Sequence, residues 1–353
     1  MYEILLAFVT AFALTFFAIP SIISIARKKQ FVDEPGERKA HDVSTPSLGG
    51  IGIFAGTLFS IVLWTPLTFF GELQYILSAF IIIFFIGAKD DIDPIEPWKK
   101  LVGEFIAAGI LIYFSDIRIT SFYGIFGISE VPLFLSVIVT LLTIVLIINA
   151  FNLIDGIDGL AGSVGALVSI TFGTWFFLVD RADMAAISFA LAGSVIAFLY
   201  YNITPAKIFM GDTGSLIIGL ATSILAINFI EHHQVLLDSK YAFRAPPGVA
   251  IGILIIPLFD TLRVFAMRMI RGKSPFQPDK NHIHHLLLSS GLTHMQSTMI
   301  LISVNLFFIL LVLYLPDMRT IFLLIFLLII ASFLTLILYL VLHLKSQKRY
   351  KAL

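Results

Sequence analysis

The sequence of 353 residues contains no cysteine, and only 13 % of its residues are charged. Disulfide bonds and thiolate metal sites are therefore excluded. Soluble domains carry about 25 % charged residues, so this chain has too little charge to form one or two of them. Its formal net charge of zero argues against a general nucleic-acid binder. The alternating polarity that is typical of membrane β-barrels is also missing.

Long apolar segments make up much of the chain. Hydrophobic residues account for 58 % of the sequence, and the mean hydropathy is +0.98. Residues 4–25 and 321–344 are each long enough to cross about 30 Å of hydrocarbon at about 1.5 Å per residue. We therefore predict an all-α, polytopic integral membrane protein with a single membrane-embedded domain, residues 1–353. Residues 1–26 lack a basic start and a small-residue cleavage site, so we expect them to remain as the first span.

The apolar runs predict about eleven transmembrane helices, and an odd number places the termini on opposite sides of the membrane. One set of connections holds 18 of the 23 lysine and arginine residues. Because cytoplasmic loops are enriched in these residues, we predict an outer N-terminus and a cytoplasmic C-terminus. The expected spans are about 3–26, 48–66, 74–88, 100–115, 132–150, 159–179, 184–201, 214–231, 247–268, 298–315 and 320–344. The expected cytoplasmic loops are about 27–47, 89–99, 151–158, 202–213 and 269–297.

Four short polar clusters interrupt the apolar chain, at residues 89–93, 149–159, 209–215 and 279–285. Each lies where an apolar run begins or ends. A carboxylate costs about 2.5–3.5 kcal/mol at the centre of a bilayer, so it belongs at the end of a span or in a polar cavity. All four clusters face the cytoplasm in a topology that was derived from lysine and arginine alone. We therefore expect them to converge on one site.

The first cluster places Asp90, Asp91 and Asp93 within four residues. Neighbouring carboxylates repel one another unless a cation or a proton lies between them. Mg²⁺ is a suitable cation, because it takes oxygen ligands and needs few from the protein when substrate phosphates supply the rest. The alternative is an acidic patch at a helix end that contacts only solvent.

The second cluster contains two Asp-Gly pairs, at 155–156 and 158–159, which are typical of tight turns with available backbone N–H groups. Asn149 and Asn152 are three residues apart and would face the same way on a helix end. An amide both donates and accepts, which suits recognition of a base or a sugar. A polar turn between two helices is the alternative.

In the third cluster, Asp212 lies between glycines just before an apolar run. Asp212 or Thr213 could be the N-cap of the following helix. The small residues at this helix N-terminus equally favour the binding of an anion such as phosphate.

The fourth cluster contains His282, His284 and His285, which follow Lys273 and Lys280 in the longest cytoplasmic loop. No HExxH pattern or cysteine accompanies these histidines, so zinc is not indicated. The basic neighbours favour contact with a diphosphate. A structural role for the histidines is the alternative.

In this order and at these span positions, the four clusters resemble the polyprenyl-phosphate N-acetylhexosamine-1-phosphate transferases. This family includes the bacterial undecaprenyl-phosphate GlcNAc-1-phosphate transferases and, more distantly, the phospho-MurNAc-pentapeptide translocases. The resemblance runs from about Asp33 to Leu292, and residues 44–50 resemble the family's segment before the second span. It implies catalytic roles for Asp90, Asp91, His282, His284 and His285, metal ligation by Asp91 and Asp212, and substrate contacts by Asn152, Asp155, Asp158, Asn202, Phe209 and Lys280.

The resemblance implies transfer of GlcNAc-1-phosphate from UDP-GlcNAc to undecaprenyl phosphate, which gives undecaprenyl-diphospho-GlcNAc and UMP. This would be the first membrane step of a cell-envelope polysaccharide pathway. The resemblance also implies Mg²⁺ as the cofactor, with Mn²⁺ as a substitute, and a cytoplasmic active site in the bacterial plasma membrane. A homodimer follows from family analogy. The run His-Ile-His-His at 282–285 favours the GlcNAc branch, because the translocases more often have three consecutive histidines there.

Two other classes of membrane protein would show different sequence patterns. A transporter would place ionisable groups at mid-membrane on broken helices. Here only Pro257, Asp260 and Arg263 fall within the ninth expected span. A CDP-alcohol phosphatidyltransferase would carry a D-G-x-x-A-R run, whereas Leu-Ala-Gly follows the Asp-Gly pair at 158–159.

Overall fold

The structure is a computed structural model that describes residues 2–31, 45–65, 70–125, 127–236, 239–272 and 281–351. Helices account for nearly all of it, because a helix satisfies its backbone hydrogen bonds internally in an apolar solvent. In chain order the elements are α1 (Tyr2–Lys29), α2 (Gly49–Trp64), α3 (Phe70–Ile92), α4 (Pro97–Phe114), β1 (Ser121–Ile125), β2 (Ile128–Glu130), α5 (Leu133–Ile154), α6 (Leu160–Leu178), α7 (Ala182–Asn202), α8 (Gly211–His232), the short 3₁₀-helix η2 (His233–Val235), α9 (Pro246–Ile253), α10 (Ile255–Ile270), α11 (Ile283–Ser289), α12 (His294–Tyr314) and α13 (Thr320–Lys351).

Eight helices in the described ranges are long and apolar enough to cross a membrane, namely α1, α3, α5, α6, α7, α8, α12 and α13. The bent pair α9 and α10 would make a ninth span. The two remaining segments that we expected to span are α2, which has 16 residues, and α4, which carries Lys99, Lys100 and Glu104. The polytopic helical fold is therefore confirmed, whereas the count of eleven and the direction of the termini stay predictions.

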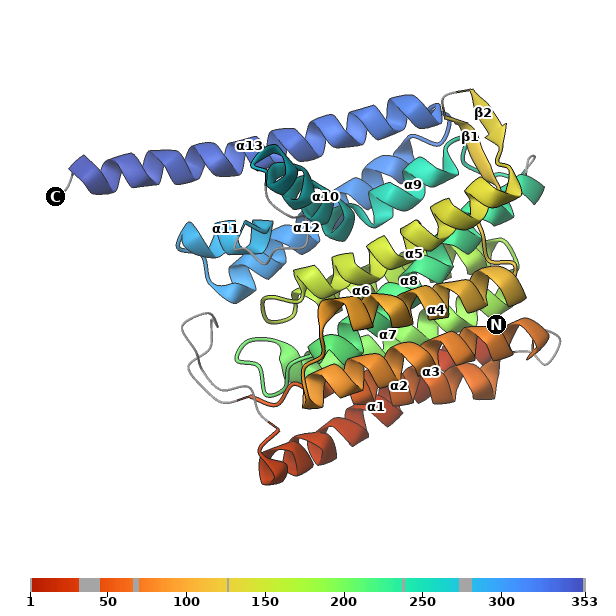
Figure 1. Cartoon of the computed structure of the whole chain (residues 1–353), viewed down its shortest axis with the longest axis horizontal. Coiled ribbons are helices and arrows are strands. Elements are labelled where there is room, and N and C mark those ends of the chain that lie inside the picture. Colours follow the sequence, from red (N-terminus) through yellow and green to blue (C-terminus); the bar gives the residue numbers. More distant parts are fainter. Residues whose placement is uncertain are drawn as a thin grey trace.

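Helix α8 lies at the centre of the bundle. Nearly all of its residues are buried, and it packs against α2, α3, α5, α6 and α9. Helices α1 and α13 lie at the periphery, and the two termini lie at opposite ends of the bundle (Figure 1). The N-terminus of α8 meets the C-terminal ends of α3 and α5 through hydrogen bonds. Three of the four polar clusters are therefore brought together by one central helix.

The ninth expected span, residues 247–268, is corrected by the structure. We expected one helix, but α9 ends at Ile253 and α10 leaves it at an angle of 87°. Pro257 is the physical reason, because proline lacks an N–H group and its ring clashes with the carbonyl four residues earlier. The buried Asn305 of α12 replaces the lost bonds. Its Nδ2 donates to the Ile253 carbonyl at 3.1 Å, and its Oδ1 accepts from the Ile256 N–H at 3.4 Å.

The antiparallel hairpin β1–β2 is the other departure from the all-helical expectation. It lies at the end of the bundle opposite to α11 (Figure 1). The N–H and hydroxyl of Thr120 donate to Glu231 of α8 at 2.8 and 2.6 Å, and the Tyr123 hydroxyl donates to the Ile230 carbonyl at 2.6 Å. The hairpin therefore fastens the C-terminal end of α8. Strands this short give no alternating pattern that stands out from apolar runs.

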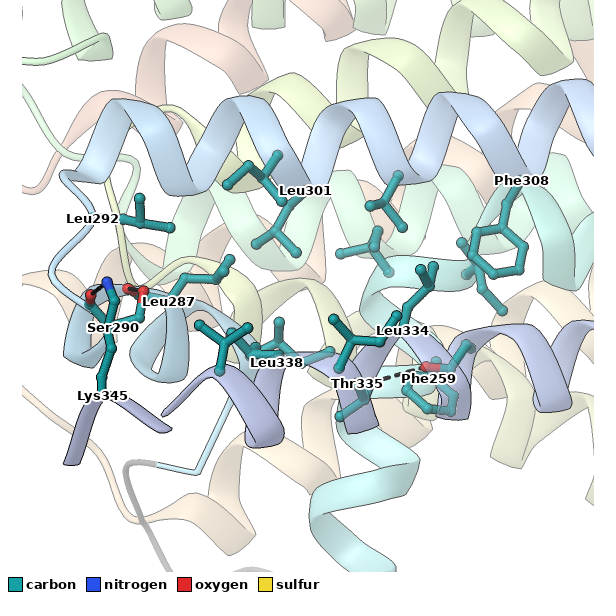
Figure 2. Close-up of a pocket in the computed structure, with 18 residues that line it drawn as sticks. Phe259, Leu287, Ser290, Leu292, Leu301, Phe308, Leu334, Thr335, Leu338 and Lys345 are labelled. Atoms are coloured by element: carbon teal, nitrogen blue, oxygen red, sulfur yellow. Dashed lines mark hydrogen bonds between the residues drawn. The ribbon is translucent and has the colours of Figure 1, made fainter. Parts of the chain in front are cut away.

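An apolar groove of about 360 Å³ lies between α10, α11, α12 and α13. The hydroxyl of Thr335 in its wall donates to the Ala331 carbonyl of its own helix at 2.9 Å, so it is already paired. One end of the groove is polar, because Lys345 Nζ donates to the Ser290 carbonyl at 2.6 Å. Figure 2 shows these groups and the apolar side chains between them, including Phe259, Leu287, Leu301, Phe308, Leu334 and Leu338.

Candidate active site

The carboxylate of Asp91 holds the first turn of α8. Its Oδ1 accepts from the N–H of Asp212 at 2.7 Å, and its Oδ2 accepts from the N–H and hydroxyl of Thr213 at 3.0 and 2.5 Å. Gly211 permits this approach, because its φ is +70° and a Cβ there would collide with the Asp91 carboxylate and the Ser47 carbonyl. The catalytic and metal-binding roles implied for Asp91 stay predictions. In the structure its oxygens stabilise the N-terminus of α8.

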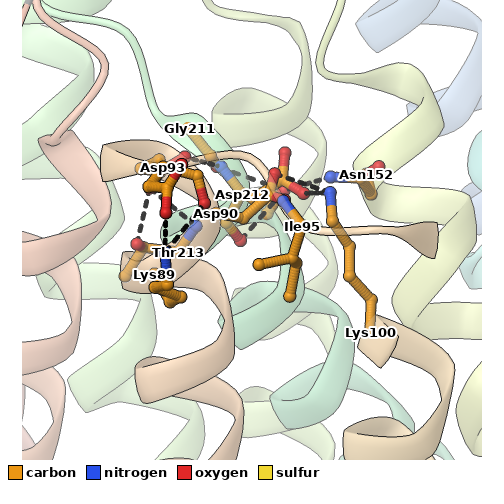
Figure 3. A network of polar contacts seen from close by, with 11 residues as sticks. Lys89, Asp90, Asp93, Ile95, Lys100, Asn152, Gly211, Asp212 and Thr213 are labelled. Carbon is orange, nitrogen blue, oxygen red and sulfur yellow. Dashed lines mark hydrogen bonds and ion pairs between the residues drawn. The ribbon is translucent and has the colours of Figure 1, made fainter. Parts of the chain in front are cut away.

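Lys100 joins the first cluster to the third (Figure 3). Its Nζ donates to Oδ2 of Asp90 and to Oδ2 of Asp212, each at 2.6 Å. The three side chains are 23 %, 13 % and 24 % exposed, so solvent screens these ion pairs less than pairs on an open surface. Sequence reasoning used Lys100 only to orient the chain. The available signal was a lysine near the start of an apolar helix, where a cation needs an acidic partner.

Asp93, the third aspartate of the first cluster, lies outside this network. It is exposed and forms an ion pair with Lys89 at the end of α3 (Figure 3). The hydrogen bond from Lys89 and its charge lower the pKa of Asp93. For this residue the solvated interpretation holds.

Asn149 and Asn152 lie in the last turns of α5. Nδ2 of Asn152 donates to the Ser215 hydroxyl of α8 at 3.1 Å, and Nδ2 of Asn149 donates to the Glu104 carboxylate of α4. Glu104 is 1 % exposed, and sequence reasoning did not assign it to the site. Among the described residues, the Oδ1 atoms of both asparagines have no hydrogen-bond donor. They are therefore available to a ligand.

The loop after α5 brings further carboxylates to the same place. The pKa of Asp155 is raised to about 8, first by burial and then by repulsion from the carboxylates of Asp212, Asp91 and Asp158. Asp155 is therefore mostly protonated at neutral pH unless a cation lies nearby. Asp158 is 6 % exposed, and its Oδ1 lies 3.5 Å from Nδ1 of His294 on α12. The aspartates of three clusters thus lie within electrostatic reach of one another.

Asn202, at the end of α7, braces this loop. Its side chain is buried, its Oδ1 accepts from the Gly159 N–H at 2.9 Å, and its Nδ2 donates to the Ile208 carbonyl at 2.9 Å. Both ends of the amide are used by backbone groups. The structure therefore favours a positioning role for Asn202 over the direct substrate contact that the resemblance implies.

Phe209 is half-buried, and its backbone pairs with the segment before α2. Its N–H donates to the Pro46 carbonyl at 2.7 Å, and its own carbonyl accepts from the Gly49 N–H at 2.9 Å. Residues 45–50 therefore lie beside the third cluster. Lys280, which the resemblance implies as a substrate ligand, lies outside the described residues.

The histidine cluster reaches the loop after α5 through His284. This side chain is 2 % exposed, and a Cβ at Gly156 would collide with its ring. Burial, with a further contribution from His285, lowers the pKa of His284 to about 3, so the ring is neutral at neutral pH. The rings of His284 and His285 are 4.2 Å apart, and Nδ1 of His282 lies 3.0 Å from Oδ2 of Asp260 on α10.

The four clusters therefore lie together at one end of the bundle, as the sequence predicted. Within the described ranges, no set of three or more His, Asp or Glu side chains is arranged to hold a metal ion. Asp90 and Asp212 share the ammonium group of Lys100, and Oδ1 of Asp212 has no hydrogen-bond donor among the described residues. The arrangement offers cations, carboxylates and amides around one central helix N-terminus, which suits binding of a polar, phosphorylated ligand.

Comparison of the sequence with known proteins identifies a matching family model and similar relatives. Residues 73–230 match the model of glycosyl transferase family 4. The undecaprenyl-phosphate alpha-N-acetylglucosaminyl 1-phosphate transferase of Pasteurella multocida is 34 % identical, over 84 % of this chain and 82 % of its own length. The probable undecaprenyl-phosphate N-acetylglucosaminyl 1-phosphate transferase of Bacillus subtilis is 31 % identical, over 87 % and 84 %. The decaprenyl-phosphate N-acetylglucosaminephosphotransferase of Mycobacterium tuberculosis H37Rv is 29 % identical, over 85 % and 79 %.

The family match covers α3 to α8, the helices that carry the first three clusters, and the relatives extend the likeness over most of the chain. The chain belongs to the family of the bacterial undecaprenyl-phosphate N-acetylglucosaminyl 1-phosphate transferases.

Proposed function

We propose that this protein transfers GlcNAc-1-phosphate from UDP-GlcNAc to undecaprenyl phosphate and releases UMP. The observation that carries this proposal is the meeting of four polar clusters around the N-terminus of α8, beside an apolar groove. The names of the relatives point to the same donor sugar and the same class of acceptor. Membership of a glycosyl transferase family argues against a transporter.

In the proposed reaction, an oxygen of the acceptor phosphate attacks the β-phosphorus of the donor. A P–O bond forms between the acceptor and the sugar phosphate. The bond from the β-phosphorus to the bridging oxygen breaks, so that UMP leaves with the electron pair. The second pKa of a phosphate monoester is about 6, so the acceptor is already largely dianionic at neutral pH. No side chain has to act as a general base, which leaves Asp90 with a positioning role.

Positive charge in the site would stabilise the donor diphosphate and the leaving UMP. Lys100 supplies a fixed cation between two carboxylates. Charge that is held in place before the reaction stabilises the transition state without reorganisation. Asn152 and the loop after α5 would hold the uridine part of the donor.

Mg²⁺, with Mn²⁺ as a substitute, is the cofactor that we propose. Asp212 would hold such an ion through Oδ1, which has no hydrogen-bond donor among the described residues, since Mg²⁺ is usually held by one or two carboxylates plus substrate phosphates. Both oxygens of Asp90 are already in use, on Lys100 and on the Ile95 N–H. When bound, the ion would neutralise charge on the diphosphate. Asp91 would contribute by holding the backbone of Asp212 in place.

The groove between α10 and α13 would hold the prenyl chain of the acceptor. Ile283 and Leu287 of α11 line this groove, while His284, which follows Ile283, packs against the loop after α5. One short helix therefore borders both the groove and the polar site. Lys345 at the end of the groove offers a positive charge to an anionic headgroup (Figure 2).

We also propose that the chain crosses the bacterial plasma membrane eleven times, with the N-terminus outside and the C-terminus and active site in the cytoplasm. The positions of lysine and arginine support this orientation. Helices α2 and α4 and the bent pair α9–α10 would complete the count. A homodimer is proposed by family analogy.

Release of UMP by the purified protein tests the reaction. The protein is incubated with undecaprenyl phosphate, Mg²⁺ and either UDP-GlcNAc or UDP-MurNAc-pentapeptide. We expect release with UDP-GlcNAc only, and loss of activity in EDTA. Release with the pentapeptide donor only would assign the translocase reaction instead, and no release with either donor would contradict the proposal.

A variant pair tests the role of Lys100 in the same assay. Lys100→Met should lower kcat by about 100-fold or more, which is typical for the loss of one preorganised electrostatic partner. The neighbouring Lys99 is exposed and pairs with Glu96, so Lys99→Met should leave the rate unchanged. Equal rates in the two variants would remove Lys100 from the site.

A further inference from the structure

The two carboxylate oxygens of Asp260 in α10 bind different partners. The side chain is 2 % exposed. Oδ2 lies 3.0 Å from Nδ1 of His282. Oδ1 accepts from the N–H of Ile283 at 3.0 Å and from Nη2 of Arg263 at 2.8 Å. One oxygen therefore faces the imidazole, and the other fastens the N-terminus of α11 and a guanidinium group.

This contact sets the orientation and the protonation of the His282 ring. A carboxylate that is paired with a guanidinium only accepts hydrogen bonds, so Nδ1 of His282 has to carry a hydrogen. The ring is 4 % exposed and stacks on His284, with centroids 5.8 Å apart and planes at 11°. Nε2 has no hydrogen-bond partner among the described residues. It is therefore the nitrogen that is available to a ligand.

We propose that Asp260 is a positioning residue for the transfer reaction. It holds His282 with Nδ1 protonated, so that Nε2 is presented to the sugar of the donor as a hydrogen-bond acceptor. This inference rests on the proposed function for the identity of the ligand. Asp260 itself would touch no substrate and would act only through His282.

With Nδ1 protonated, Nε2 keeps its lone pair and can accept a hydrogen bond from a hydroxyl or amide N–H group of the donor sugar. The other titratable or charged groups around the pair are Arg263 on α10, His284 and His285 on α11, and His294 on α12. The same logic orients the imidazole in hydrolase triads, where a buried carboxylate faces one ring nitrogen.

Asp260→Asn should keep the contacts to Arg263 and the Ile283 N–H and change only the contact to His282. The single oxygen of the new amide is needed by Arg263 and by the Ile283 N–H, so the NH₂ group has to face His282. Nδ1 then accepts a hydrogen bond, and the ring hydrogen moves to Nε2. We expect the ¹⁵N NMR signals of His282 in selectively labelled protein to change from the Nδ1–H form to the Nε2–H form. A His282→Gln variant assigns these signals.

The kinetic expectation is a fall in kcat/KM of about 10- to 100-fold, as is typical when a group that orients a functional histidine is removed. In a His282→Gln background, the same Asp260→Asn change should cost less than about threefold, because the two residues act as one unit. Arg263→Gln is the matched control. It loosens the same anchor of α11 without touching His282, so it should leave the tautomer as it is in the unaltered protein.

The inference is overturned if Asp260→Asn keeps the Nδ1–H tautomer, or if its cost is the same with and without His282. It is also overturned if Arg263→Gln changes the tautomer as much as Asp260→Asn does. The NMR experiment needs no substrate, so it remains decisive if UDP-GlcNAc is not the donor. A thermal melt of each variant in the same detergent shows which of them are folded.

Discussion

Four aspartates of the site differ in what surrounds their carboxylates. Asp91 uses both oxygens on the first turn of α8, and Asp90 and Asp212 share the ammonium group of Lys100. Asp155 has no such cation among the described residues, and its pKa is raised to about 8. At the scale of the residue, the hydrogen bonds that are already made therefore decide which carboxylate oxygens are still available to another partner.

From the raised pKa of Asp155 we predict that Mg²⁺ binding depends on pH. Its raised pKa means that the native protein keeps a proton at neutral pH, and a cation among the carboxylates has to displace it. The apparent affinity for Mg²⁺ should therefore rise with pH, by up to about tenfold per unit, and level off above about pH 8. Calorimetry near pH 7 in two buffers of different ionisation enthalpy measures the released proton.

Asp155→Asn is the control for this titration, because it keeps the shape of the side chain and removes its proton. The variant should show the same binding enthalpy in both buffers. If the unaltered protein also gives equal enthalpies, Asp155 is already ionised without the metal and the prediction is wrong.

At the scale of the element, the break between α9 and α10 shapes both the groove and the histidine cluster. Helix α10 leaves α9 at 87°, contributes Phe259 to the groove and places Asp260 against His282. Both residues follow Pro257 within one turn. The buried amide of Asn305 pairs the backbone groups that the break releases. A polar side chain on one helix thus stabilises an irregular segment of another.

Asn305→Leu tests this account. The substitution keeps a side chain of similar size but leaves the Ile253 carbonyl and the Ile256 N–H without their partner. A buried group without a partner costs about 1–3 kcal/mol, so we expect a loss of at least about 2 kcal/mol in the free energy of unfolding. A thermal or denaturant melt in detergent measures it.

Asn228→Leu is the matched control, since in the described part of the chain Asn228 bonds only a carbonyl of its own helix α8, that of Ile224, at 3.0 Å. It should lower the stability far less than Asn305→Leu. Equal losses in the two variants would show that the amide of Asn305 has no special role at the break.

At the scale of the whole molecule, the two ends of the bundle differ in chemistry. One end carries the four polar clusters, with the basic C-terminal part of α13 on the same side (Figure 1). The other end carries the hairpin β1–β2 and the C-terminal end of α8. Lysine and arginine are scarce in the connections at that end. This asymmetry predicts which end faces the cytoplasm.

Single cysteines test the orientation directly, because the chain has no cysteine of its own. Gln234 beside the hairpin and Ser289 on α11 are both exposed. A membrane-impermeant maleimide should label Gln234→Cys in intact cells and label Ser289→Cys only after the cells are permeabilised. The reverse labelling pattern would invert the predicted topology and place the site on the outer side of the membrane.

Most of the fold class could be predicted from the sequence. Apolar runs long enough to span a membrane are local features, and each expected span corresponds to a helix or, for 247–268, to a bent pair. The clusters around Asp90, Asp155, Asp212 and His284 were found because carboxylates and histidines are rare in such a chain. The hairpin and the break were missed, because a short strand or a single proline gives a weaker signal than a long apolar run.

The sequence by itself determined a helical membrane protein with its polar residues gathered at span ends, since hydropathy and charge act on each segment separately. Only the tertiary structure decided which of these residues contact one another. Lys100 joins Asp90 to Asp212, and Asp260 holds His282 from 22 residues away. The side-chain amide of Asn202 forms hydrogen bonds with two backbone groups. A hydrogen-bonding group serves the partners that packing brings to it, and those partners come from other helices.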